Sequence, residues 1–243
     1  MKLLNRRAEQ RVADAVIRDP EEHTVFDAEG GVRSVQAADL TMPRESLDAI
    51  WSPMHLERLA RTYWKYLSRV TLGLIRVVYT PAERAVVLIG RPLVLLRFDA
   101  PEYAMDDTHG VVRWRIRDGI LVASKGHAGD GYLEIDVTRC PEDDADRARL
   151  HVEVEVTSFY PALVLRNARW LYANTQSRIH VLVTHGFLRS LARLELEESA
   201  VGRFADPQPE HPPVNVGDTP WAAVGALLAL LAGALALFAR RFR

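Results

Sequence analysis

The stretch Leu150-His-Val-Glu-Val-Glu-Val156 decides the fold class, because apolar and polar residues alternate along all of it. Successive side chains of a β-strand point to opposite sides, so this pattern predicts a strand with one buried and one solvated face. Two other segments, Val112–Arg117 and Tyr132–Val137, alternate in the same way. Strands of this kind are typical of an antiparallel sheet with one face on the core.

Three short β-rich runs lie earlier in the chain, at Leu74–Tyr79, Ala85–Ile89 and Leu93–Phe98. Only a few residues connect them, which indicates antiparallel neighbours. A further strand is expected at Ile120–Ser124, after the tight turn Arg117-Asp118-Gly119. The sequence therefore predicts about seven antiparallel strands.

Two helices are expected to flank these strands. Ser52-Pro53 is typical of an N-cap followed by proline at the first helical position, and apolar residues then recur at helical spacing as far as Val70. A long closing helix is indicated by apolar residues that step by three and four from Leu171 to Leu194. Its apolar stripe can be buried only against the sheet.

The predicted fold class is α+β, an antiparallel sheet wrapped on a long C-terminal helix and followed by one transmembrane helix. At the N-terminus, the positions of Leu4, Ala8, Val12, Ala15 and Val16 favour a basic amphipathic helix. That helix would either dock on its own domain or lie on an anionic membrane surface. We expect a helix and linker at residues 1–42, the α+β domain at 43–200, a proline-rich linker at 201–219, a transmembrane helix at 220–239 and an arginine-rich tail at 240–243.

This order of elements resembles the START-like, or polyketide-cyclase-like, helix-grip superfamily over residues 43–199. The resemblance implies a cavity between the sheet and the last helix that holds a lipid or another apolar molecule. The superfamily has no short signature in this chain, so the resemblance carries over no binding residue. The first strand of such a fold has one candidate, Gly31–Gln36.

The firmest expectation is a C-terminal membrane anchor, since no charged residue occurs in the 21 positions from Thr219 to Ala239. A helix of that length reaches about 30 Å, the thickness of the hydrocarbon core of a bilayer. Trp221 and Phe238 lie at the ends of the apolar segment, Gly225 and Gly233 lie within it, and Arg240, Arg241 and Arg243 follow it. The sequence thus predicts a single-pass protein of the cell membrane. We expect the domain on the cytoplasmic side, because no apolar run near Met1 would export it.

Composition and motifs argue against several other classes of function. The net charge of -1 gives no reason to expect a nucleic-acid partner, and the single cysteine, Cys140, precludes both an intrachain disulfide and a thiolate metal cage. No phosphate loop, nucleophile elbow or zinc-protease helix occurs, so no catalytic residue, metal or cofactor is predicted. His180 and His185 are five residues apart, a spacing that points two helical side chains in different directions.

The leading hypothesis is a membrane-tethered, non-catalytic module that binds a lipid or another apolar small molecule. Gly186 within the closing helix would mark either a close approach of the sheet or room for a ligand. The candidate cavity residues lie on the inner face of the sheet and on the closing helix: Trp114, Ile116, Leu133, Ile135, Val152, Val154, Leu182, Val183 and Gly186.

Two alternatives stay open. One is a membrane-anchored scaffold with a filled core that acts through contacts with an unidentified protein partner. The other is an enzyme of cyclase or hydrolase type that uses Asp106, His109 or His127. The charged side of the predicted sheet, from Arg113 to Glu155, is interpreted as an ordinary solvated face.

Overall fold

The computed structural model describes residues 12–18, 24–88, 93–123, 130–141, 144–160, 176–193 and 196–198. Within these ranges the protein forms one antiparallel sheet whose strands are hydrogen-bonded in the order β1-β3-β10-β9-β8-β6-β5-β4, with β2 on β3 and β7 on β8. The strands are β1 (Asp14–Arg18), β2 (Thr24–Phe26), β3 (Val32–Pro43), β4 (Ile75–Tyr79), β5 (Glu83–Leu88), β6 (Leu93–Asp99), β7 (Glu102–Met105), β8 (His109–Asp118), β9 (Tyr132–Cys140) and β10 (Arg147–Phe159). The α+β class predicted from the sequence is confirmed.

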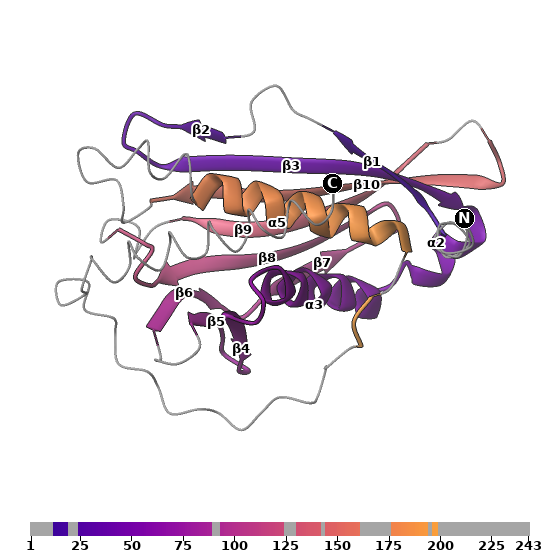
Figure 1. Cartoon of the computed structure of the whole chain (residues 1–243). Helices are drawn as coiled ribbons and strands as arrows, with labels where there is room; N and C mark the ends of the chain where they lie inside the picture. Colours follow the sequence, from indigo (N-terminus) through magenta and orange to yellow (C-terminus); the bar gives the residue numbers. More distant parts are fainter. Residues whose placement is uncertain are drawn as a thin grey trace, which may run out of the picture.

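The helices are α2 (Arg44–Ile50), α3 (Pro53–Val70) and α5 (Gln176–Ser190), and a short 3-10 helix, η2 (Leu191–Arg193), follows α5. Helices α3 and α5 cover the same face of the sheet and contact each other (Figure 1). Ser52 is the N-cap of α3 as predicted, and its side chain accepts a hydrogen bond from the backbone N–H of His55. The core therefore lies between one sheet face and a layer of two helices.

The strands predicted from alternation are confirmed, and their polar face carries ion pairs. Val152 and Val154 of β10 are fully buried, whereas Arg113 of β8 lies opposite Glu134 of β9 and pairs with it through Nε at 2.5 Å. Arg115 pairs with Glu102 of β7 at 2.8 Å. A solvated sheet surface normally carries opposite charges on neighbouring strands. The ion pairs therefore agree with the interpretation of this side as a solvated face.

The N-terminal part of the sheet differs from the sequence prediction. Asp14–Arg18 is strand β1 and not part of a helix, because Ala15 and Ile17 pack toward the core while Asp14, Val16 and Arg18 are exposed, a period of two. The candidate strand at Gly31–Gln36 is confirmed and extends to Pro43, so the sheet begins before the predicted domain boundary at residue 43. Ten strands and not about seven are found among the described residues, because β1, β2, β3 and β7 add four, while the strand predicted at Ile120–Ser124 does not form over its described residues.

The strand predicted at Ile120–Ser124 is wrong over its described residues. The chain turns sharply at Gly119, which has a φ of +140°, and Ile120 and Leu121 lie in that turn. Their backbone N–H groups donate to the carbonyl oxygens of Val94 and Leu95 at 3.1 Å. Val122 forms an isolated β-bridge and the Ala123 N–H donates to the carbonyl oxygen of Tyr160 at 2.7 Å, so the described residues form short contacts and not a full strand.

The predicted transmembrane segment at 220–239, the proline-rich linker and the terminal arginines lie outside the described residues. Neither α3 nor α5, nor any other helix in the described part of the chain, combines the length and apolar character needed to cross a bilayer.

Candidate ligand-binding site

The interface between the sheet and α5 is closely packed where the structure describes it. Val183, Phe187 and Leu188 of α5 are at most 1% exposed, and the ring of Phe187 meets that of Tyr63 edge-on at 5.3 Å between centroids. The candidate cavity residues Ile116, Leu133, Ile135, Val154 and Val183 all belong to the hydrophobic core. The side chain of Leu182 lies outside the described part of the structure.

Gly186 marks a close approach, but of a helix and not of the sheet. A Cβ atom at this position would lie 2.7 Å from Cε1 and Cζ of Tyr66 on α3, and closer still to the Tyr66 hydroxyl. The missing side chain of Gly186 thus admits the ring of Tyr66 between α3 and α5. The space beside Gly186 is occupied by protein.

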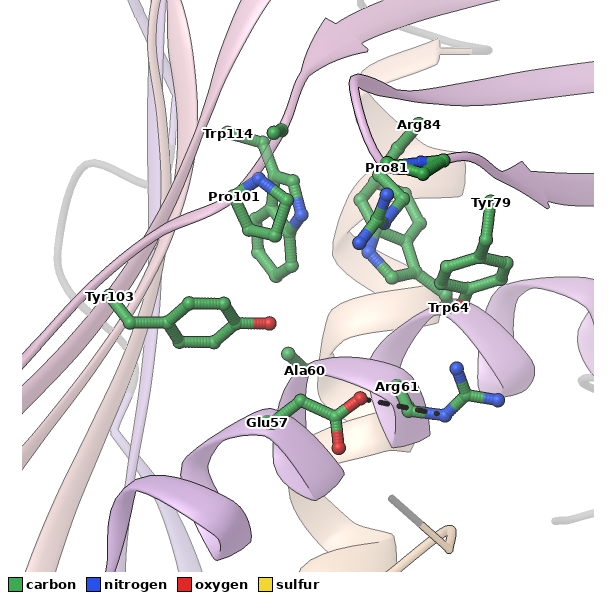
Figure 2. A pocket seen from close by; sticks show the side chains of 11 residues that line it. Glu57, Ala60, Arg61, Trp64, Tyr79, Pro81, Arg84, Pro101, Tyr103 and Trp114 are labelled. Carbon is green, nitrogen blue, oxygen red and sulfur yellow. Dashed lines mark ion pairs between the residues drawn. The ribbon is translucent and has the colours of Figure 1, made fainter. Parts of the chain in front are cut away.

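A pocket of about 190 Å³ lies on the other side of α3, between that helix and the strands from β4 to β8 (Figure 2). Trp114 is the one predicted cavity residue that lines it. The complete lining is Glu57, Ala60, Arg61, Trp64, Tyr79, Pro81, Arg84, Ala100, Pro101, Tyr103 and Trp114. A smaller recess of about 50 Å³ lies near the end of α5, is lined mainly by apolar side chains and includes Val152.

The helical repeat of α3 places four of these residues together. Glu57, Ala60, Arg61 and Trp64 are spaced by three and four, so they form one stripe along the helix. Tyr79 ends β4 and Tyr103 lies on β7, and Figure 2 shows the Tyr103 hydroxyl directed into the space above Glu57. Elements far apart in the sequence therefore build the walls.

Two tryptophans form the deep side of the pocket. Trp64 and Trp114 are 3% and 1% exposed, and their rings meet edge-on with centroids 5.2 Å apart and an interplanar angle of 76°. Among the described residues, neither indole Nε1–H has a hydrogen-bond partner. A buried donor without an acceptor costs free energy, on the order of 1–3 kcal/mol, unless another group accepts its hydrogen bond.

Three charged side chains flank these rings. The Arg61 Nε and Glu57 Oε1 atoms are 3.9 Å apart, and the guanidinium carbons of Arg61 and Arg84 lie 5.0 and 5.1 Å from the centroid of the Tyr79 ring. Arg84 is buried, and its Nη1 donates to the carbonyl oxygens of Thr80 and, at 2.9 Å, of Glu83. One carboxylate and two guanidinium groups leave an excess of one positive charge.

The two tyrosines of the pocket remain protonated over the physiological pH range. Burial raises the pKa of Tyr79 to about 12, against the smaller lowering effects of Arg61 and Arg84. Burial and the charge of Glu57 likewise raise the pKa of Tyr103 to about 12. A neutral phenol can donate a hydrogen bond, so each hydroxyl is a donor available to a ligand.

The residues of the enzymatic alternative do not assemble into a described catalytic cluster. The Asp106 carboxylate accepts hydrogen bonds from the backbone N–H groups of Thr108 and His109 at 2.7 Å, which shapes the β7–β8 turn and lowers the pKa of Asp106. The His109 ring contacts the carboxylate of Asp136 on the outer sheet face, and His127 lies outside the described residues. No group of side chains suited to a metal ion occurs in the described ranges.

Sequence reasoning missed most of the pocket. The sequence prediction gave Glu57 and Arg61 no role beyond that of helix residues. This charged pair, four residues apart, lies beside Ala60 and Trp64 on the buried side of the helix. That pairing was a usable signal. Nothing local in the sequence shows that Tyr79 and Tyr103 would meet this stripe.

No family model matches this sequence, and no curated protein matches it. Similar solved structures include norcoclaurine synthase from Thalictrum flavum, at 13% identity and a TM-score of 0.32, over 74% of this chain and 98% of that chain. A conserved protein from Geobacillus kaustophilus matches at 13% identity and a TM-score of 0.27, over 56% of this chain and 90% of that chain. CalU16 from Micromonospora echinospora matches at 10% identity and a TM-score of 0.22, over 93% of this chain and 98% of that chain. Because these TM-scores are low, we argue the site from the residues of this chain alone.

Proposed function

We propose that this protein is a membrane-tethered, non-catalytic module of helix-grip type that binds one small, flat, largely apolar molecule in the pocket beside α3. The observation that carries the proposal is the pocket wall: two buried tryptophans and two tyrosines around a space of about 190 Å³. Aromatic walls with a few polar groups are typical of small-molecule sites. Tyr103 is part of the pocket lining and is exposed, so the pocket reaches the protein surface at this residue.

The volume narrows the class of ligand. Pockets for drug-sized molecules usually enclose roughly 300–1,000 Å³. A space of about 190 Å³ suits a molecule of one or two rings, and a lipid with long acyl chains does not fit within it. The proposed ligand is therefore smaller than the lipid expected from the sequence.

Binding without catalysis agrees with the ionisation of the pocket. An efficient general acid or base has a pKa near the working pH, whereas the pKa values of Tyr79 and Tyr103 are about 12. Arginine side chains do not exchange protons at neutral pH. These groups are suited to hold a ligand in place.

The proposed tether is the uncharged stretch from Thr219 to Ala239, which is long enough to cross a bilayer. The proline-rich residues 201–219 would act as a semi-rigid spacer between the anchor and the domain. A cytoplasmic domain remains part of the proposal, and digestion of the domain by protease added outside intact cells would overturn it.

Ligand binding is tested with indole as the probe and the full chain in detergent micelles. Ala100 lines the pocket and is partly exposed, so Ala100→Leu narrows the pocket without overpacking the core. Ala104→Leu on β7 is the matched control, because Ala104 is exposed and does not line the pocket. We expect saturable indole binding by NMR that Ala100→Leu weakens at least about tenfold and Ala104→Leu leaves unchanged. Equal binding by both variants would refute the pocket as the site.

The close packing beneath α5 favours one second candidate, a membrane-anchored scaffold with a filled core. If that candidate holds, the full chain binds no small aromatic probe. A stable protein partner then co-purifies with it, and the partner is lost when the outer charges Arg113 and Arg115 are replaced.

A further inference from the structure

The turn between α3 and β4 exposes two leucines. Leu72 and Leu74 are 71% and 39% exposed, and a Cβ atom at Gly73 between them would meet no described atom within 4 Å. Apolar residues scattered over a protein surface are common, so exposure alone gives this turn no role. Its backbone and its charges add two independent observations.

The backbone makes leucine an unfavourable residue at position 72. Helix α3 ends with hydrogen bonds from the Gly73 N–H to the Ser68 carbonyl oxygen at 2.8 Å and from the Leu72 N–H to that of Arg69 at 3.1 Å. This helix end places Leu72 at a φ of +53°, a conformation that glycine or asparagine usually adopts. Leu72 neither packs on the core nor suits its backbone, so the stability of the fold does not account for a leucine here.

The charge around the two leucines is positive. From Arg58 to Ala82 the chain has five basic residues and no acidic one, although its net charge is -1. Arg69 and Arg76 flank the leucines, are exposed, and form no ion pair with another described residue. We call Arg69, Leu72, Leu74 and Arg76 the α3–β4 tip. Exposed apolar side chains beside arginines are typical of surfaces that lie on an anionic membrane.

The last described segment, residues 196–198, is bound to the side of α3 that leads to this tip. Three residues spaced by four and three along the helix contact it: Arg58, Thr62 and Lys65. The Lys65 Nζ atom lies 2.5 Å from Glu197 Oε1, and Arg69 continues the same stripe four residues later. Residues 199–218 then connect this segment to the proposed anchor, a length of chain that spans tens of ångströms when extended. The tip can therefore reach the membrane that holds the anchor.

We propose that the α3–β4 tip is a membrane-contact site, where Leu72 and Leu74 enter the headgroup region and Arg69 and Arg76 bind the phosphates of anionic lipids. This proposal goes beyond the pocket and rests on the tether of the proposed function. The tether keeps the tip at a high effective concentration near the bilayer, so a small contact is enough to hold the domain there. The proposed cytoplasmic orientation fits, because the cytoplasmic leaflet is rich in anionic lipids.

A second copy of the chain is the competing occupant. Strand β4 lies at the edge of the described sheet, so its outer side offers backbone groups to another strand (Figure 1). Pairing two copies through β4 would bring two positively charged tips together, and like charges oppose that contact. The charge of the tip therefore favours an anionic membrane.

The test follows a fluorescent label on the full chain reconstituted into vesicles. Cys140, the single cysteine, is replaced by serine, and an NBD group is attached through Leu74→Cys. Val16→Cys is the matched label site, since Val16 is 58% exposed and β1 lies at the opposite edge of the sheet from β4. In vesicles of phosphatidylcholine and phosphatidylserine, we expect blue-shifted emission and quenching by brominated lipid at position 74 and neither at position 16.

Variants of the labelled chain separate docking from folding. Leu72→Asn suits the positive φ, so its urea midpoint in detergent should stay equal or rise while docking weakens about fivefold or more. Arg69→Gln combined with Arg76→Gln should weaken docking roughly 25-fold, because each arginine near an anionic surface contributes about fivefold. Val16→Thr is the control for loss of an exposed apolar side chain and should leave docking unchanged.

The outcomes distinguish this proposal from the proposed function. A label at position 74 that is as accessible to water as the label at position 16, in vesicles that retain the chain, would overturn the membrane contact and leave the tether and the pocket intact. Equal docking on phosphatidylcholine alone would overturn the role of anionic lipids. Cross-linking between two Leu74→Cys copies would assign the tip to a second copy. A chain that vesicles do not retain would overturn the tether itself, and this contact with it.

Discussion

The close approach of Gly186 and Tyr66 gives a quantitative prediction about how α5 docks on α3. In Gly186→Ala, the new methyl group would lie 2.7 Å from two carbons of the Tyr66 ring, well inside van der Waals contact. Moving the ring costs about 1–3 kcal/mol, as overpacked sites do. Alanine also stabilises a helix interior by about 1 kcal/mol relative to glycine. The single variant should therefore lose about 0–2 kcal/mol of the free energy of unfolding.

Removing the ring reverses the sign of the effect. In a Tyr66→Ala background the clash is absent, so Gly186→Ala should stabilise the protein by about 1 kcal/mol. The predicted coupling between the two sites is then about 1–3 kcal/mol. Urea unfolding of all four proteins in the same detergent, followed by tryptophan fluorescence, measures it. Additive effects of the two substitutions would show that Gly186 does not hold the Tyr66 ring and would refute the packing described here.

Three further predictions concern the stability of the fold. Ser52→Ala removes the N-cap of α3 and should cost about 1 kcal/mol in the same unfolding assay, with Ser52→Asp as a variant that restores the cap. Gly119→Ala should cost more than 1 kcal/mol, because Gly119 has a φ of +140° and a Cβ would lie 2.7 Å from a backbone carbon of β6; an unchanged midpoint would contradict this turn geometry. Burial alone would raise the pKa of Asp39, but hydrogen bonds from His151 and Arg18 outweigh it and lower that pKa. The folded-state pKa thus lies below the unfolded value of about 3.9, so this stabilisation is complete above about pH 5 and is lost as the pH falls through the folded pKa; Asp39→Asn should flatten that part of the pH profile.

Strong local patterns in the sequence were enough to predict most of the sheet. The alternation in Leu150–Val156 continues for long enough that only a strand satisfies it, and β10 indeed buries Val152 and Val154. The segment Asp14–Arg18 is too short for its pattern to distinguish a strand from a helix. Val12 and Val16 fit a helix by their spacing of four, while Ala15 and Ile17 fit a strand by their spacing of two. Pairing with β3, about twenty residues further along the chain, decides in favour of the strand.

The candidate site shows a different limit of sequence reasoning. The apolar residues of the strands do lie on the inner face of the sheet, as predicted. Whether such a residue lines a cavity depends on how completely the side chains of the covering helices fill the space beside it. Trp114 is part of the pocket lining and Ile135 is not, although both are buried and both alternate identically along their strands. That difference arises from α3 and α5, whose distance from the sheet is set by side chains such as Trp64 and Phe187.

The large aromatic residues of α3 explain why the pocket lies beside that helix and not beneath α5. Tyr63 turns toward Phe187 and closes the space under α5, whereas Trp64 turns toward Trp114 and Phe98 and covers the sheet below α3. Ala60 lies one turn before Trp64 on the same face of α3. Its side chain is too small to fill the space beside it, and that space is part of the pocket. An aromatic residue at position 60 would extend the packed layer over the whole inner face. The pocket therefore depends on the small side chain of Ala60. Substitution of Ala60 by leucine should abolish indole binding while Tyr63 and Phe187 remain in contact.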